Sequence, residues 1–304
     1  MIGQAAPATN LQQKMAKGRV ANGNVANGSG HSPTPNADMA LQQAMSALNN
    51  KRPDEAQLIA AEVLRRVPRH AGALHIAGCA LLMQGRANEA IAPLEAAARA
   101  QHNPEIDVAL AEALRQVGRL DDAVARLRRA TKRQPPFVPA FHDLGRLLAF
   151  LQRYEEAIEA FRRGVELAPM AMQLWLRLGG LYMQIRKWSD AKAAFAQTLN
   201  IAPNSPEALF GLAKAHQELG EYRAAAECYR RSLRLKSDPL VWHNLGRCLL
   251  MIGETEEGYD CLRWAVRGDP KRYGGVLGTL VKSPHGRFFL KPSAASRFIR
   301  EAKS

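Results

Sequence analysis

The side chains of this sequence that could bind another molecule are mostly cationic. Arginines recur at a similar spacing along the chain: Arg128 and Arg129, Arg162 and Arg163, Arg230 and Arg231, and Arg263. A guanidinium group presents a planar fork of N–H donors that matches a carboxylate or a phosphate. If these arginines hold one position of a repeated element, they form an outer ridge. Such a ridge is either a solvated surface or a track for an anionic partner.

Groups that could catalyse a reaction do not converge in the sequence. The eight histidines are scattered without a ligand-like i, i+4 pair, and the four cysteines form no C-x-x-C pair. No nucleophile elbow, phosphate-binding loop, dinucleotide fingerprint or zinc-ligand spacing is present. We therefore expect a protein that is not an enzyme and that has no cofactor and no metal site. The cysteines are expected to be small apolar fillers.

The elements that must position the cationic residues follow a repeated pattern. Its clearest copy runs from Trp175 to Pro203 and reads W-x2-L-G-x2-Y, then A-x3-F, then P. A unit of this kind is a helix–turn–helix of about 34 residues. The pattern resembles the tetratricopeptide repeat (TPR) family. That resemblance implies an all-α, right-handed superhelical solenoid of about seven repeats with a C-terminal helical cap.

The copies of the pattern divide the chain into an arm, an array and a tail. The arm, residues 1–36, is rich in Ala, Asn and Gly and is expected to be disordered. Seven repeats are predicted at 37–70, 71–103, 104–137, 138–171, 172–205, 206–238 and 239–272. Residues 273–304 are predicted to be a basic helical cap, with helices at 273–283 and 293–303. Ser293 is the expected N-cap of the second of these helices.

Local features recur with the repeats. Four glycines fit the left-handed position after a helix: Gly85, Gly118, Gly220 and Gly253. Small residues such as Gly179 let the two helices of a repeat approach closely, while large ones such as Phe195 fill the gap to the next repeat. Acidic residues fall in the first turn of most second helices, where they meet its positive dipole end.

In the TPR family the first helix of each repeat lines a concave groove, and mapping those helix positions here predicts two zones. The later groove is cationic and is expected to bind the partner: His142, Arg146, Arg177, Lys214, His243, Asn244 and Arg247. The early groove is apolar: Leu41, Met45, Leu48, Cys79, Leu82 and Val108. The resemblance implies a scaffold or adaptor that holds an extended or helical segment of a partner protein. The cationic zone favours an acidic segment. The alternative for this zone is a set of solvated charges, and the apolar zone could instead be covered by the N-terminal arm.

The net charge of +14 is concentrated in the tails, with +3 in residues 1–36 and +7 in residues 271–304. The nearly balanced array makes nucleic acid an unexpected partner. A basic tail suits an anionic membrane surface. The alternative function is therefore a TPR subunit that recruits an enzyme within a bacterial surface-polysaccharide, glycosylation or secretion assembly. No apolar run reaches the length of a membrane span and the N-terminus shows no secretory signal, so a cytoplasmic location is expected.

Overall fold

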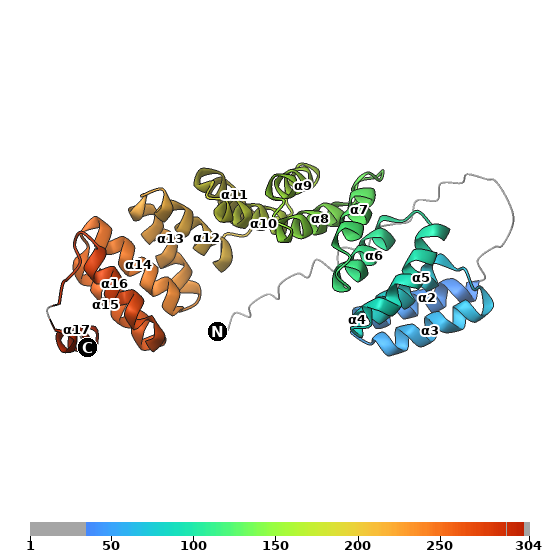
Figure 1. The fold of residues 1–304 in the computed structure, drawn as a ribbon, viewed down its shortest axis with the longest axis horizontal. Helices are drawn as coiled ribbons and strands as arrows, with labels where there is room; N and C mark the ends of the chain where they lie inside the picture. Colours follow the sequence, from blue (N-terminus) through green and yellow to red (C-terminus); the bar gives the residue numbers. More distant parts are fainter. Residues whose placement is uncertain (1–34, 290, 301–304) are drawn as a thin grey trace, which may run out of the picture. The chain divides into compact units, whose positions relative to one another are not determined.

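The computed structural model describes residues 35–289 and 291–300, and within them the chain forms 16 α-helices and no strand (Figure 1). From residue 40 onward, the described residues form one compact unit, which holds the features discussed below. The helices are α2 (Pro35–Asn49), α3 (Pro53–Arg66), α4 (Ala71–Met83), α5 (Ala87–Ala100), α6 (Pro104–Gln116), α7 (Leu120–Thr131), α8 (Val138–Phe150), α9 (Tyr154–Leu167), α10 (Met172–Gln184), α11 (Trp188–Ile201), α12 (Pro206–Glu218), α13 (Tyr222–Leu235), α14 (Pro239–Ile252), α15 (Thr255–Gly268), α16 (Tyr273–Lys282) and α17 (Pro292–Arg300). A short 3-10 helix, η1 (Pro270–Arg272), precedes α16.

From α3 to α15 each helix packs against the next one along the chain, and the first helices α4, α6, α8, α10 and α12 also touch in sequence. One continuous apolar core runs through these pairs from Leu81 to Cys261. The all-α TPR solenoid expected from the sequence is confirmed. The domain boundaries stay predictions. The predicted disordered arm lies outside the described residues, apart from residues 35 and 36, which begin α2.

The turns inside the repeats share one backbone conformation. The four glycines predicted for it have φ values of 76° to 85°. Lys51, Gln152 and Arg186 hold the same place in their own turns, with φ of 58°, 60° and 60°. In each case the amide of the next residue bonds back to the preceding helix, as Lys187 N does to Tyr182 O at 2.9 Å. The hydrogen-bonded turn therefore imposes the left-handed conformation even where the residue is not glycine.

Close approach of the two helices of a repeat depends on glycine at a fixed position of the first helix. A Cβ atom on Gly78 would lie 2.4 Å from the Leu94 side chain, and one on Gly145 would lie 2.6 Å from the Phe161 ring. Each aromatic or leucine side chain lies over its glycine because no side chain stands between the helices. This is the small-against-large packing that the sequence predicts.

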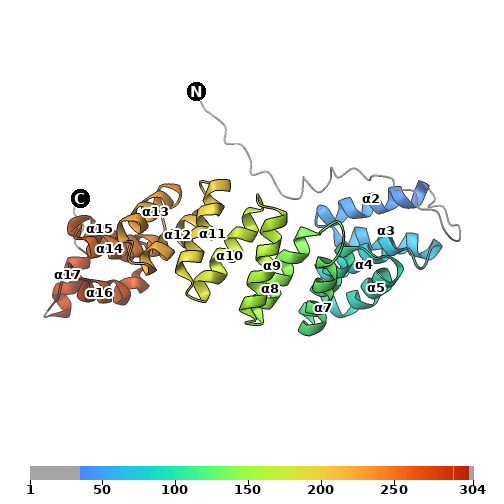
Figure 2. The same ribbon diagram turned by 90° about the horizontal axis from the view of Figure 1, so that it is seen from above.

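The C-terminal cap is built from η1, α16 and α17, which pack beside α14 and α15 (Figure 2). Its core joins Leu250 and Leu262 of the last repeat to Val276, Leu280 and Ile299. The Phe298 ring packs edge-on against Tyr259, and the guanidinium groups of Arg263 and Arg287 lie over it at 4.5 and 4.8 Å from its centroid. The prediction of Ser293 as N-cap is wrong, because α17 already begins at Pro292. The basic tail thus uses aromatic residues for packing.

The cysteines are free thiols, and three of the four are buried. Burial is the main cause that raises the pKa of Cys79, Cys248 and Cys261 to about 12. A thiol with so high a pKa stays protonated and unreactive near neutral pH. These residues behave as the apolar fillers that the sequence predicts.

Candidate binding groove

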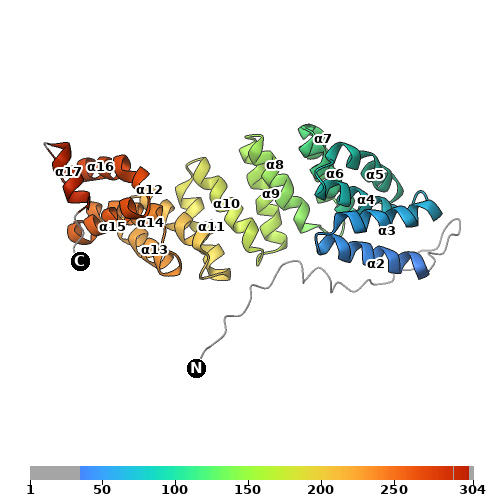
Figure 3. The same cartoon turned by 90° about the horizontal axis from the view of Figure 1, so that it is seen from below.

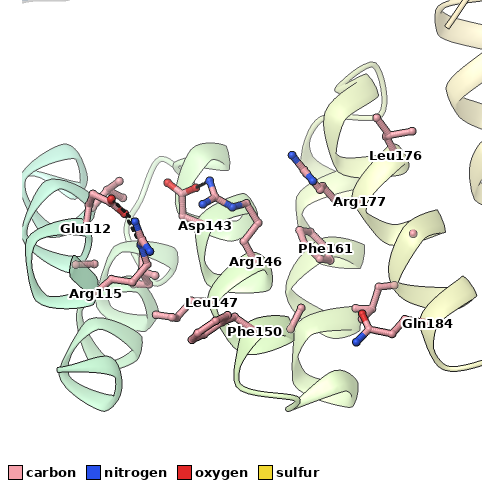
Figure 4. Close-up of a pocket in the computed structure, with 16 residues that line it drawn as sticks. Glu112, Arg115, Asp143, Arg146, Leu147, Phe150, Phe161, Leu176, Arg177 and Gln184 are labelled. Carbon is pink, nitrogen blue, oxygen red and sulfur yellow. Dashed lines mark hydrogen bonds and ion pairs between the residues drawn. The ribbon is translucent and has the colours of Figure 1, made fainter. Parts of the chain in front are cut away.

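First helices of three consecutive repeats enclose a groove of about 460 Å³, called the central groove below (Figure 4). Its lining comes mainly from α6, α8 and α10: Val108, Glu112, Arg115, Asp143, Arg146, Leu147, Phe150, Leu176, Arg177 and Gln184. Two predicted partner-binding residues, Arg146 and Arg177, therefore lie in one groove. They project from neighbouring helices because equivalent positions of successive repeats face the same side.

The charged side chains of the central groove differ in how far they are already paired. Arg115 donates to both carboxylate oxygens of Glu112, at 2.8 and 2.6 Å. This hydrogen bonding is the main cause that lowers the pKa of Glu112. Arg146 lies only within 3.5 Å of Asp143, and Arg177 forms no ion pair with any residue that the structure describes. In the central groove, Arg115 is therefore fully paired, Arg146 is weakly paired and Arg177 is unpaired among the described residues.

An exposed aromatic ring lies in the same groove. Phe150, the last residue of α8, is 72% exposed although large apolar side chains are usually covered. Leu147 and Leu176 line the groove beside it. The arrangement offers an apolar contact surface next to cationic donors. Sequence reasoning missed Phe150, Leu176 and Gln184, because only the packing of α8 against α10 brings them to the groove.

The other predicted cationic residues lie apart from the central groove or at its edge. His142 contacts the carboxylate of Asp143 at 3.0 Å. Lys214 of α12 pairs with Glu218 at 3.0 Å, and the Gln217 amide oxygen can accept from both Lys214 and Arg247. The cationic zone is thus divided into a part on α8 and α10 and a part on α12 and α14.

Helix α16 lies against α14 at the part of the predicted groove nearest the C-terminus (Figure 3). The His243 Nε2 atom lies 2.8 Å from Thr279 Oγ1. Burial is the main cause that lowers the pKa of His243, with Arg272 and Arg247 adding to it. Asn244 and Arg247 line a hollow of about 590 Å³ together with the glycines of α16. The cap helix therefore forms one wall of this hollow, which His243 also lines, and it partly buries the His243 ring.

Most side chains of the predicted apolar zone pack within the core or against it. Leu48 belongs to the core at 8% exposure, and Leu41 and Cys79 pack against the same cluster. Leu82 and Val108 pack against the main core. Met45 is exposed. Of this zone, Val108 joins the central groove.

The arginine ridge on the second helices is mostly tied to neighbouring repeats. Arg128 pairs with Glu156 of the next repeat. Arg230 donates to Glu254 and Glu257 of the next repeat at 3.0 and 2.7 Å. Lys192 and Glu221 form the same kind of contact at 2.8 Å. These contacts favour the structural interpretation of the ridge over an anionic-partner track.

The fold and the central groove define a helical-repeat scaffold that offers an extended surface for protein interaction. Two sequence models described as "Tetratricopeptide repeat" match the chain, one at residues 81–148 and 186–245 and the other at residues 41–104 and 142–208. Together they span residues 41–245, more than half of the chain. The chain belongs to the tetratricopeptide repeat family.

Solved structures with the same fold include the MamA protein, PilF of Pseudomonas aeruginosa and YrrB. MamA is 19% identical, with a TM-score of 0.52 over 56% of this chain and 94% of its own. PilF is 20% identical, with a TM-score of 0.54 over 66% and 92%. YrrB, described as a TPR protein with an unusual peptide-binding site, is 14% identical, with a TM-score of 0.51 over 60% and 94%. No curated protein matches the chain. None of the helices described here has the length and apolarity to span a bilayer.

Proposed function

We propose that this protein is a non-catalytic scaffold that binds a segment of a partner protein in the central groove. The observation that carries the proposal is that an unpaired cation and an exposed aromatic ring lie in the same groove. Arg177 is a cation without a carboxylate partner among the described residues, and Phe150 is an aromatic ring open to solvent. A peptide can pair with the guanidinium group and cover the apolar ring at the same time, whereas solvent leaves the ring exposed.

The chemistry of the groove favours an acidic segment with an apolar side chain. Arg146 and Arg177 supply forked donors for a carboxylate of the partner. Phe150 and Leu176 supply the contact for an aromatic or aliphatic side chain next to that carboxylate. Because Arg177 is exposed, its contribution should weaken as salt increases. The peptide-binding site named for YrrB supports the idea that an array of this fold can hold a peptide.

The test is a selection of random 12-residue peptides on the full chain. We expect enriched sequences to join Asp or Glu to an aromatic or aliphatic residue. Their binding should fall at least tenfold in the Arg146→Glu/Arg177→Glu variant. The matched control is Arg223→Glu/Arg267→Glu, two exposed arginines that do not line the groove. If the selected peptides bind the parent, the groove variant and the control variant equally, the central groove is not the binding site.

The alternative function uses the same groove with a different partner. In it, an enzyme of a surface-polysaccharide, glycosylation or secretion assembly is recruited, and the basic tail lies at a membrane. Phe289 and Phe298 already pack within the cap, which leaves Phe288 as the exposed aromatic of that segment. We therefore favour the plain scaffold, with the expected cytoplasmic location as part of the proposal.

A further inference from the structure

A second hollow, of about 470 Å³, lies where the end of α7 meets the loop before α6. We call it the cationic hollow, and its lining is His102, Arg129, Lys132 and Arg133. No carboxylate lines it among the residues that the structure describes. The three positive charges around this hollow repel one another unless a negative charge lies among them.

A single buried carboxylate stands behind the hollow. The Asp107 side chain of α6 is 1% exposed, and neither of its oxygens has a hydrogen-bond partner in the described part of the chain. Three guanidinium groups approach it loosely. The Arg129 Nε atom lies 3.3 Å from Oδ2, while Arg126 and Arg133 come only within 3.9 and 4.0 Å of the carboxylate.

The negative charge of Asp107 balances only part of the positive charge in this cluster of cationic side chains. One carboxylate needs one guanidinium, yet Arg126, Arg129 and Arg133 bring three positive charges to it, and Lys132 adds a fourth charge to the lining of the hollow. Lys132 pairs with no described carboxylate, and the buried Nε of Arg133 has no hydrogen-bond partner. The cluster therefore holds more donors and more positive charge than the protein itself uses.

All four lining side chains of the hollow carry hydrogen-bond donors. Arg129 Nη2 lies 3.0 Å from His102 Nδ1, so Nδ1 accepts and the proton of the neutral ring stands on Nε2, which can donate in turn. Arg133 adds a second guanidinium group and Lys132 adds a point charge, while Arg129 already directs Nη2 to His102 and Nε to Asp107. Forked guanidinium groups with a lysine beside them match the tetrahedral oxygens of a phosphate group.

We propose that the cationic hollow binds a phosphate group that carries about two negative charges, either as free phosphate or as a phosphorylated serine of a peptide. Its lining shares no residue with the central groove, so the inference is independent of the function proposed above. Binding would bring the missing negative charge to Arg133 and Lys132.

Isothermal titration calorimetry on the full chain, at constant ionic strength set by chloride, tests the proposal. One arm titrates inorganic phosphate and the other a short glycine-flanked phosphoserine peptide, with the unphosphorylated peptide as reference. We expect saturable binding in at least one arm and none of the reference peptide. Binding of both probes shows that the phosphate group alone suffices, and binding of one identifies the source. Absence of saturable binding in both arms overturns the proposal.

Two variants locate the site. Lys132→Gln/Arg133→Gln should weaken binding at least tenfold, while Arg223→Gln/Arg267→Gln removes the same charge elsewhere and should leave binding unchanged. Lys132→Gln alone keeps the test valid if the double variant unfolds, because this exposed side chain makes no ion pair with Asp107. An equal loss in hollow and control variants would mean general charge attraction and would refute the site.

Discussion

The ring of Phe195 lies so close to Gly179 that a Cβ atom on this glycine would stand 2.8 Å from Cε1. The same ring would meet a Cβ atom on Gly211 of the next repeat at 2.5 Å. One aromatic ring therefore fills the space between two first helices. Both glycines are required by this contact, which joins one repeat to the next.

We predict that Gly179→Ala destabilises the array by about 1–3 kcal/mol, because the buried ring cannot move away without displacing its neighbours. The matched control is Gly180→Ala on the same helix, where a Cβ atom meets nothing within 4 Å. That change should stabilise by about 0.5–1 kcal/mol through helix propensity. Urea unfolding measures both. Equal effects of the two substitutions would contradict the packing argument.

Arg186→Gly should stabilise the protein by about 1 kcal/mol, since Arg186 holds a left-handed conformation that costs an ordinary residue about that much. Gly118→Ala makes the opposite change at the equivalent turn, where φ is 83° and no atom crowds the Cβ position. It should destabilise by a similar amount. Thermal unfolding of the two variants checks the prediction, and a loss of stability in Arg186→Gly would be inconsistent with it.

Arg263→Met should release α17 from the last repeat. The Arg263 side chain is buried, its Nε donates to the Phe298 carbonyl at 3.0 Å, and it pairs with Asp260 at 2.7 Å. Removing this buried charged donor takes away the hydrogen bond to the Phe298 carbonyl, which ties α17 to α15. We expect amide hydrogen exchange in α17 to accelerate at least tenfold while exchange in α10 stays unchanged. Arg267→Met, an exposed change on the same helix, serves as control and should leave α17 protected.

The buried thiols should react slowly with iodoacetamide in the folded protein. Raising the pKa of Cys248 from 9.0 to about 12 lowers its thiolate fraction at pH 8 by about a thousandfold. Because the folded pKa lies above the unfolded one, the stability contributed by the protonated thiol is present below pH 9 and is lost as pH rises toward 12. Mass spectrometry of labelled protein, with and without denaturant, measures the difference. Rapid labelling of the native chain at pH 8 would show that Cys248 is accessible.

Phe150→Ser should leave stability within about 0.5 kcal/mol of the parent, because the ring is mostly exposed. It should nevertheless weaken binding of selected peptides about tenfold, through loss of the apolar contact in the central groove. Met170→Ser, an equally exposed apolar residue that does not line the groove, should have no effect on binding. Fluorescence anisotropy compares peptide binding by the parent and the two variants. Undiminished binding by Phe150→Ser would mean that Phe150 is not part of the binding site.

Much of the binding surface could not be predicted from position in the repeat alone. Arg146 and Arg177 do line one groove, as their equivalent positions imply. His243 has the same kind of position, yet it contacts Thr279 of the cap helix, which comes from a segment outside the repeat pattern. The same holds for the arginine ridge, where Arg230 meets a glutamate of the following repeat across a distance that the sequence does not reveal.

The sequence by itself determined the repeated helix–turn–helix unit and the sites of its turns and close contacts. It could do so because these features rest on neighbours within one 34-residue copy, and Gly118 or Gly145 acts through local geometry. Only the tertiary structure decided which side chains remain exposed to solvent. Exposure of Phe150, burial of Leu48 and the gathering of three guanidinium groups around Asp107 depend on how separate helices stack. Stacking is a relation between distant segments, so no local pattern encodes it.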